Sequence, residues 1–340
     1  MIKIPLMDVR NRSLVEVTKA HADKARDLIE KSKNAFGLAS RLASGIALPL
    51  GDYFSRKWLD RTRNPYLAEI DEYAEILGMR GVYALNMCYE WGCTSGVYNV
   101  GGTPHLLRVL DWPFPGLGEN MVVALQNDSA GEFYNITWPG VSGVFQAMAP
   151  GRFAISLNQA PMRRYRSGII LDWVRNRFLI NRETGLPPAH LLRRAFEICP
   201  NYADVVRFLS TEPVSIPVLY TIAGTDEGEG CVIERLEHES VIRDMSSSQY
   251  TNSYVCVANH FESRLNGMGH GWLPRALKSN ERSLAASRVN PDDIHDDFSW
   301  FKAPIANDLS RLALHANPAS GSFSLIGTNG TSPVTEVFKQ

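Results

Sequence analysis

Residues 92–113 read GCTSGVYNVGGTPHLLRVLDWP, and this stretch predicts a β-hairpin. Two strand-like runs flank Gly101-Gly102, and a two-residue glycine loop is typical of a tight hairpin turn. With this loop the numbers of facing residues add up to 203, so Cys93 faces Leu110. Arg108 then lies on the same face of the ribbon as Cys93, because side chains alternate along a strand.

Asp111 ends the second run and is out of phase with Cys93. It can approach the cysteine only from the strand end, where Pro113 prevents further pairing, or through a β-bulge. A guanidinium and a carboxylate beside a thiol are expected to lower the pKa of the thiol and to orient its base. Spacing alone is weak support for such a site, since these three residue types often occur together by chance.

Blocks of helical and strand-like patterns predict the organisation around the hairpin. Residues 13–92 show helical periodicity, and short strand-like runs separated by Gly, Pro and Asn follow Cys93. Blocks of this kind favour layered α+β packing over a doubly wound sheet. Later helices are predicted at Ile169–Ile180, Pro188–Ile198, Tyr202–Leu209, Glu281–Ser287 and Ile305–Ala316, and later strands at Val218–Ala223, Cys231–Glu234 and Tyr254–Ala258.

The composition excludes several classes of protein. The 340 residues are 44% hydrophobic, which is too apolar for a disordered chain. The 35 basic and 36 acidic residues nearly cancel, so no basic excess favours nucleic-acid binding. The five cysteines are an odd number without a CxxC pair, and no Cys/His spacing fits a zinc site. We therefore expect mostly buried, reduced thiols, no metal and no cofactor.

The sequence shows neither a signal peptide nor a run of apolar residues long enough for a transmembrane helix. A cytoplasmic location is the default expectation. The nearest membrane candidate is Ala35 to Gly51, which Pro49 is expected to stop. We expect this segment to be an amphipathic helix packed on the domain, and peripheral membrane contact is the alternative.

A series of motifs follows the hairpin in a fixed order, and together they resemble one family. The motifs are Cys93-Thr-Ser, Arg108-x-Leu-Asp111-Trp, Trp138-Pro-Gly-Val-Ser-Gly143, Ala149-Pro-Gly to Asn158, Gly228 to Arg235, Ala258-Asn259-His260 and Asn280-Glu-Arg282. This set resembles the N-terminal nucleophile hydrolases, above all acid ceramidase and N-acylethanolamine-hydrolysing acid amidase. Bile-salt hydrolase and penicillin V acylase, of the choloylglycine hydrolases, are wider relatives. The resemblance covers roughly residues 65–285.

The resemblance implies a fold and a division of the chain. The fold would be a four-layer αββα sandwich with an N-terminal helical segment. A precursor would cut itself between Gly92 and Cys93. Residues 1–92 would become an α-subunit, and residues 93–340 would form the catalytic β-subunit of one shared sandwich. The product would be an α/β heterodimer, with higher oligomers open.

The resemblance also implies roles for site residues. Cys93 would supply both the thiolate nucleophile and, after the cut, an α-amine as general base. Asn259 would donate to the oxyanion, and Asp111 would hold the new ammonium. Arg108 and Arg282 would support the thiolate and the polar network. The expected substrate and oxyanion region contains Trp138, Val141, Ser142, Gly143, Asn158 and Gln159, with a backbone N–H near Val141–Gly143 as second donor.

The chain departs from the family pattern in three places. Gln159 stands where the acid ceramidase-like relatives carry Glu, His260-Phe261 stands where the family has Tyr-Asp, and the insert before Arg282 is longer. The acidic pH preference of the relatives is therefore not carried over. A dyad of Cys93 with His105 or His260 is not required if the amine is the base.

The function predicted from the resemblance is hydrolysis of a small-molecule N-acyl amide with a lipid-like acyl chain. The alternatives are acyl transfer to another acceptor, an acylase for penicillins, bile salts or acyl-homoserine lactones, and a binding protein without catalysis.

Overall fold

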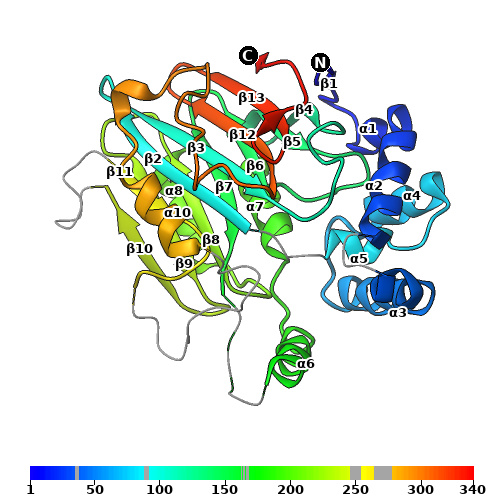
Figure 1. Cartoon of the computed structure of the whole chain (residues 1–340). Helices are drawn as coiled ribbons and strands as arrows, with labels where there is room; N and C mark the ends of the chain where they lie inside the picture. The colour runs from blue at the N-terminus through cyan, green and yellow to red at the C-terminus, as the bar shows by residue number, and fades with distance from the viewer. Residues whose placement is uncertain are drawn as a thin grey trace.

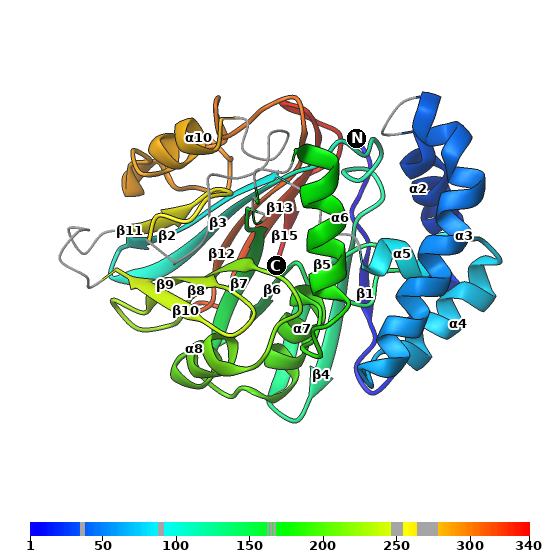
Figure 2. The ribbon, with the colours of Figure 1, turned by 90° about the horizontal axis from the view of Figure 1, so that it is seen from below.

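The computed structural model describes residues 1–34, 38–87, 92–161, 163, 165, 168–245, 254–263 and 278–340. The first part of the chain is mostly helical, and its helices gather at one side of the molecule (Figure 2). Its elements are β1 (Leu6–Asp8), α1 (Val15–Ala20), α2 (Ala22–Asn34), α3 (Leu38–Arg61), α4 (Leu67–Leu77) and α5 (Val82–Asn86).

Two sheets form the centre of the molecule (Figure 1). The first sheet, sheet A, has the order β1-β4-β5-β6-β7-β8-β9-β10. Its later strands are β4 (Val122–Asp128), β5 (Gly131–Thr137), β6 (Gln146–Ala149), β7 (Phe153–Gln159), β8 (Val218–Ala223), β9 (Gly230–Arg235) and β10 (Ser240–Asp244).

The second sheet, sheet B, has the order β11-β2-β3-β12-β13-β14, and β15 also pairs with β13. It combines the hairpin at Cys93 with the end of the chain. Its strands are β2 (Gly92–Val100), β3 (Thr103–Asp111), β11 (Tyr254–Val257), β12 (Ser310–Asn317), β13 (Ser322–Asn329), β14 (Ser332–Pro333) and β15 (Phe338–Lys339).

Helices cover the outer faces of both sheets, which confirms the predicted four-layer sandwich. Figure 2 shows α10 (Ser279–Ala286) beyond sheet B and α7 (Pro188–Ile198) and α8 (Tyr202–Thr211) beyond sheet A. Phe196 of α7 stacks on Phe133 of β5 with ring centroids 5.3 Å apart. The main core lies between the sheets, where apolar side chains from both become fully buried.

The predicted hairpin is confirmed in its register. Cys93 pairs with Leu110, and Ser95 pairs with Arg108, around the turn at Gly101-Gly102. Both turn glycines have positive φ values, 60° and 85°, which a two-residue hairpin loop requires and glycine adopts without strain.

Two expectations for the N-terminal segment need correction. The segment is not purely helical, because β1 joins sheet A parallel to β4, with Leu6 facing Val123. Three residues on a sheet edge are too short to leave a periodic pattern in the sequence. Pro49 does not stop the apolar segment, since α3 contains it and continues to Arg61. Residues 35–37 of that segment lie outside the described ranges.

The helix predicted at Ile305–Ala316 is wrong, because residues from Ser310 onward form the strand β12. The strand lies between β3 and β13 and has buried side chains on both faces. A strand buried on both sides does not alternate between apolar and polar residues, so its sequence does not reveal its period.

The four cysteines in the described ranges, Cys93, Cys199, Cys231 and Cys256, are buried free thiols, as expected. Cys88 lies outside those ranges. No described helix combines the length and the apolar character needed to cross a bilayer.

Candidate active site

Cys93 lies at the start of β2, fully buried, with its side chain on the face of sheet B that meets sheet A. The residue before it, Gly92, faces Asp111 across the hairpin. A methyl group at position 92 would come within 3.3 Å of the Asp111 Cβ, so glycine suits this close approach. The strand start therefore places the Gly92–Cys93 peptide directly beside a carboxylate.

Arg108 is a fully buried cation on the Cys93 face of the hairpin. Its Nη1 donates to Asn158 Oδ1 at 2.6 Å and to Ser95 Oγ at 3.4 Å. Among the described residues, its Nε and Nη2 have no hydrogen-bond partner. A buried guanidinium without a carboxylate partner is costly, which makes it well suited to stabilise an anion such as a thiolate.

Asn259 follows β11 and contacts the backbone of the cysteine. Its Oδ1 accepts the backbone N–H of Cys93 at 2.9 Å and an N–H of Arg282 at 2.8 Å. Its amide nitrogen donates to the carbonyl of Gln159 at 2.9 Å, so the predicted oxyanion donor is engaged within the protein.

Arg282 projects from α10 onto the outer face of sheet B and joins several groups of the site. It donates to the backbone carbonyl of Cys93 and to Thr94 Oγ1, the latter at 2.9 Å. Its Nη1 lies 3.5 Å from Asp111 Oδ2. Arg282 thus links Asp111 to the Cys93 carbonyl and to Asn259, which accepts the Cys93 N–H.

Asp111 is on the opposite face of the hairpin from the Cys93 thiol, as its phase predicted. The pairing of β3 with β12 shifts register beside it, between Ser310 and Leu312. Asp111 Oδ1 accepts the hydroxyl proton of Ser310 at 2.7 Å. Burial raises the pKa of Asp111, and the charge of Arg282 opposes that rise.

The thiol itself behaves differently from the sequence-based expectation. Burial raises the pKa of Cys93 above its ordinary value, and the positive charges of Arg108 and Arg282 offset only part of this effect. Asp111 raises the pKa further. The prediction of a lowered thiol pKa is therefore wrong for the uncut chain. The loss of solvation raises the pKa by more than the charges of the two arginines lower it.

The predicted oxyanion region divides into two places. Asn158 and Gln159 lie at the site: Arg108 donates to the Asn158 side chain, and Asn259 donates to the Gln159 carbonyl. Trp138 instead donates its indole N–H to the Leu117 carbonyl at 2.8 Å and lines a pocket.

Two of the backbone N–H groups expected to be donors are already used. The Val141 N–H bonds to the Trp138 carbonyl, and the Ser142 N–H donates to Asn86 Oδ1 at 2.8 Å. Gly143 packs closely on α7, where a methyl group at position 143 would come within 2.6 Å of the Ala189 Cβ.

Arg193, Ser310 and Ser279 carry no motif in the sequence, whereas Asn86 belongs to Leu85-Asn86-x-Cys-Tyr89-Glu90, which resembles the segment of the family just before the proposed cut. Asn86 and Arg193 hold the two sides of the Ser142 peptide, Arg193 by donating to its carbonyl at 2.8 Å. Ser310 contacts Asp111, and Ser279 accepts the backbone N–H of Asn259 at 2.8 Å. Each contact joins residues more than fifteen positions apart, and no local pattern records it.

The two histidines considered as bases have other partners. His105 bonds through Nδ1 to His315 Nε2 at 2.8 Å. His260 bonds through Nδ1 to Ser279 Oγ at 2.7 Å. The geometry therefore gives no support to a cysteine–histidine dyad.

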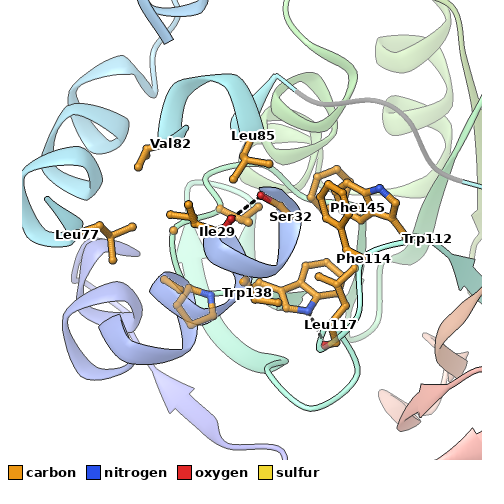
Figure 3. Close-up of a pocket in the computed structure, with 15 residues that line it drawn as sticks. Ile29, Ser32, Leu77, Val82, Leu85, Trp112, Phe114, Leu117, Trp138 and Phe145 are labelled. Carbon is orange, nitrogen blue, oxygen red and sulfur yellow. Dashed lines mark hydrogen bonds between the residues drawn. The ribbon is translucent and has the colours of Figure 1, made fainter. Parts of the chain in front are cut away.

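An apolar pocket lies between the N-terminal helices and the segment that follows β3 (Figure 3). Its space, open mouth included, is about 570 Å³. None of the described residues that line it carries a charged side chain, and the Ser32 hydroxyl is bonded to the Ile29 carbonyl at 2.7 Å. Six of its residues are Ile29, Leu77, Leu85, Trp112, Trp138 and Phe145.

Comparison with known proteins agrees with the motif resemblance. The chain is 26% identical over 178 residues to the N-acylethanolamine-hydrolyzing acid amidase of Cavia porcellus, covering 50% of this chain and 48% of that protein. It is 25% identical over 135 residues to the acid ceramidase of Pan troglodytes, covering 40% of this chain and 33% of that protein. The chain thus spans half or less of the length of these two relatives. No family model matches it.

One solved structure shares the fold. An N-acylethanolamine-hydrolyzing acid amidase ortholog of Caenorhabditis elegans superimposes with a TM-score of 0.53 at 18% identity, covering 67% of this chain and 93% of that one. The sequence matches confirm the predicted resemblance to acid ceramidase and N-acylethanolamine-hydrolyzing acid amidase, and the shared fold confirms the predicted sandwich.

Proposed function

We propose that the protein is a cysteine-dependent hydrolase of N-acyl amides that first cuts itself between Gly92 and Cys93. One arrangement carries the proposal. The N–H of Cys93, which would become the amine, bonds to Asn259, and the carbonyl and neighbours of Cys93 contact Arg282. Arg108 and Asp111 complete a buried set of charges around this peptide. The low-identity relatives with amidase names support the same reaction class.

In the proposed cutting step the Cys93 sulfur attacks the Gly92 carbonyl carbon. The C–N bond breaks, its electron pair stays on nitrogen, and the thiol proton ends on the new amine. Water then hydrolyses the Gly92 thioester, which releases a carboxylate and restores the thiol. Asp111, facing Gly92 across the hairpin, is placed to stabilise the ammonium form of the amine.

In amide hydrolysis the free α-amine, with a reference pKa of about 7.7–8.0, would take the thiol proton and return it to the leaving nitrogen. The thiolate attacks the substrate carbonyl to form an acyl-enzyme, which water hydrolyses to the acid. Arg108 is the buried cation that would stabilise the thiolate. For Asn259 to stabilise the oxyanion, its amide must exchange the Gln159 carbonyl for the substrate oxygen.

The apolar pocket supports a lipid-like acyl chain as the bound part of the substrate. Trp112 in its wall directly follows Asp111, which pairs with Gly92, so the wall starts next to the strand that carries Cys93. A neutral apolar lining favours an uncharged chain, which gains roughly 0.8 kcal/mol per buried methylene group.

Three measurements test the proposed function. Intact mass distinguishes a cut chain from a whole one. A hydrolysis panel then compares acylethanolamines, ceramides, acyl-homoserine lactones, conjugated bile acids and phenoxyacetyl amides at two pH values. Product analysis with an added amine or alcohol separates hydrolysis from acyl transfer. A chain that stays whole and hydrolyses none of these amides would instead be a binding protein on this fold.

Filling the pocket should change chain-length preference. We expect Leu28→Trp, on the pocket side of α2, to lower kcat/KM for long acyl chains about tenfold relative to short ones, because the pocket loses the space for several methylene groups. Asp23→Trp on the exposed side of the same helix is the matched control. An equal loss of kcat/KM for long and short acyl chains would mean that this pocket does not bind the acyl chain.

A buried ion-pair network would keep the two cut pieces together. Arg193 of α7 binds both carboxylate oxygens of Glu69 of α4, at 2.6 and 3.1 Å, and also Glu197 at 3.0 Å. Its guanidinium lies over the Tyr66 ring, 4.2 Å from the centroid. Glu69 and Tyr66 belong to the proposed α-subunit and Arg193 to the proposed β-subunit, so this contact crosses the division.

We expect Arg193→Met to lower the free energy of unfolding by about 3 kcal/mol, because Glu69, whose side chain is only 11% exposed, is left without its cation. After the cut, residues 1–92 should also separate from the remainder during size-exclusion chromatography in mild urea. Arg194→Met is the matched control. The side chain of Arg194 is half-exposed, and its ion pair with Glu197 is longer, at 3.4 Å, so this variant should lose less than about 1 kcal/mol. Similar losses in the two variants would contradict the role of the buried pair.

A further inference from the structure

His260, which follows Asn259 directly, belongs to a hydrogen-bonded chain that ends at Cys93. Ser279, the buried first residue of α10, accepts the Asn259 backbone N–H at 2.8 Å. The same Ser279 oxygen lies 2.7 Å from His260 Nδ1. Asn259 in turn accepts the Cys93 N–H on its side chain at 2.9 Å.

The hydrogen bonds at Ser279 allow its hydroxyl to join Asn259 to the neutral histidine. A backbone N–H can only donate, so the Ser279 oxygen is an acceptor toward Asn259. The hydroxyl can donate its own proton to His260 Nδ1, which accepts it only as the unprotonated nitrogen of a neutral imidazole. In this arrangement the ring proton of neutral His260 is on Nε2, the side facing Glu262 at 4.0 Å.

Protonation would reverse one bond of this chain. The imidazolium carries a proton on Nδ1 as well, so it becomes a donor toward Ser279, and the hydroxyl proton of Ser279 loses its acceptor in a buried place. The His260 side chain is 23% exposed, so protons from solvent can reach it. The charged groups that act on it are Glu262, Glu234, Arg243 and Arg282.

We propose that His260 is a positioning residue that makes the alignment of Asn259 with Cys93 depend on pH. Neutral His260 anchors the Ser279 hydroxyl, and Ser279 holds the Asn259 backbone in place. Protonated His260 reverses this bond and leaves the buried hydroxyl proton of Ser279 without its acceptor, so hydrolysis falls on the acid side. The inference rests on the proposed function, because Asn259 matters through the reaction at Cys93.

Burial lowers the pKa of His260 from its ordinary value, and the carboxylates of Glu262 and Glu234 oppose this shift. The neutral form, and with it the intact chain of hydrogen bonds, should therefore persist as the pH falls through about 6.5, the ordinary pKa of histidine. The acid limb of activity is expected below that value.

The pH profile of hydrolysis by the cut enzyme tests the proposal. In His260→Gln the side-chain oxygen can accept from Ser279 without titrating, so the acid limb should move to lower pH by at least about one unit. In Ser279→Ala we expect activity at the plateau to fall about tenfold, because a buried N–H loses its acceptor. His260→Gln should then have no further effect on the profile in the Ser279→Ala background. His238→Gln, an exposed histidine paired with Glu183, is the matched control and should leave the profile unchanged.

A second measurement does not depend on activity. Long-range imidazole ¹⁵N–¹H NMR spectra, with the His260 signal assigned by its loss in His260→Gln, should show the Nε2–H tautomer in the wild type and a mixture of tautomers in Ser279→Ala. An Nδ1–H tautomer in the wild type, or an unchanged acid limb in an active His260→Gln enzyme, would overturn the inference and leave the proposed function standing. A wild type with the Nε2–H tautomer and the Ser279 dependence, but without amide hydrolysis, would support the hydrogen-bonded chain and overturn the proposed function.

Discussion

Cys93→Ala should yield a chain that is neither cut nor able to hydrolyse amides. The variant lacks the sulfur that attacks the Gly92 carbonyl, and without the cut no α-amine forms at position 93. Both nucleophile and base would be lost together, so we expect kcat to fall by at least about 10⁴-fold. Intact mass shows the state of the chain, and product release from the best amide of the panel gives the rate.

The control for this variant is Cys231→Ala, which removes another buried free thiol from a strand of sheet A. Cys231→Ala should still be cut completely, and its rate of amide hydrolysis should stay close to that of the wild type, because it loses only a small amount of packing. A cut or active Cys93→Ala protein would remove the nucleophile from the mechanism. An uncut wild type that still hydrolyses amides would remove the amine but retain the thiol.

Arg282→Gln should damage both stability and activity, because Arg282 is the cation that contacts Asp111, Asn259 and the Cys93 carbonyl. Asp111 would remain buried without its ion pair, at a cost of about 3–5 kcal/mol in the free energy of unfolding. We expect kcat/KM to fall by about 10²–10³, the usual effect of losing a positioned electrostatic group. Thermal unfolding and hydrolysis rates measure the two effects.

The loss of stability in Arg282→Gln should depend on pH in a definite direction. Burial already raises the pKa of Asp111, and removing the opposing charge of Arg282 raises it further. A carboxyl group with a raised pKa in the folded state favours folding below its unfolded pKa, and this contribution is lost as the pH rises through the folded value. The difference from the wild type should be smallest near about pH 4 and grow toward neutrality.

The double variant Arg282→Gln with Asp111→Asn is the matched control. It removes the uncompensated carboxylate, so it should recover most of the lost stability and its pH dependence but none of the activity. An equal loss of stability in the single and double variants would mean that Arg282 contributes through packing alone.

The sequence predicts those parts of the site whose geometry is local. The two glycines at 101 and 102 define the hairpin turn, and the turn alone determines that Arg108 lies on the Cys93 face. The phase of Asp111 is equally local, and the hairpin register continues without a bulge to the pair Gly92–Asp111, so Asp111 lies at the strand end, one of the two routes that the sequence left open. Asn259 and Arg282 were identified only through the family motifs, because their contacts with Cys93 span 166 and 189 positions.

Other features depend on burial, which a sequence pattern does not measure. Arg108 and Arg282 predict a lowered thiol pKa on charge alone, but full desolvation of Cys93 reverses the sign. Ser279 and Arg193 act through backbone groups of distant loops, so their residue types give no signal. The strand β12 was missed because both of its faces are buried, which removes the alternation that identifies most strands.

The short strand β1 determines how refolding after denaturation depends on the cut. In the continuous chain, β1 is tethered to β4 through 113 intervening residues, Val9 to Met121, so their pairing is an intramolecular event. Once the chain is cut as we propose, the same edge strand belongs to a separate polypeptide, and its return to sheet A becomes a bimolecular encounter that depends on protein concentration. The uncut chain should therefore refold reversibly under conditions in which the cut protein does not, so that self-cleavage converts a thermodynamic minimum into a kinetically maintained state.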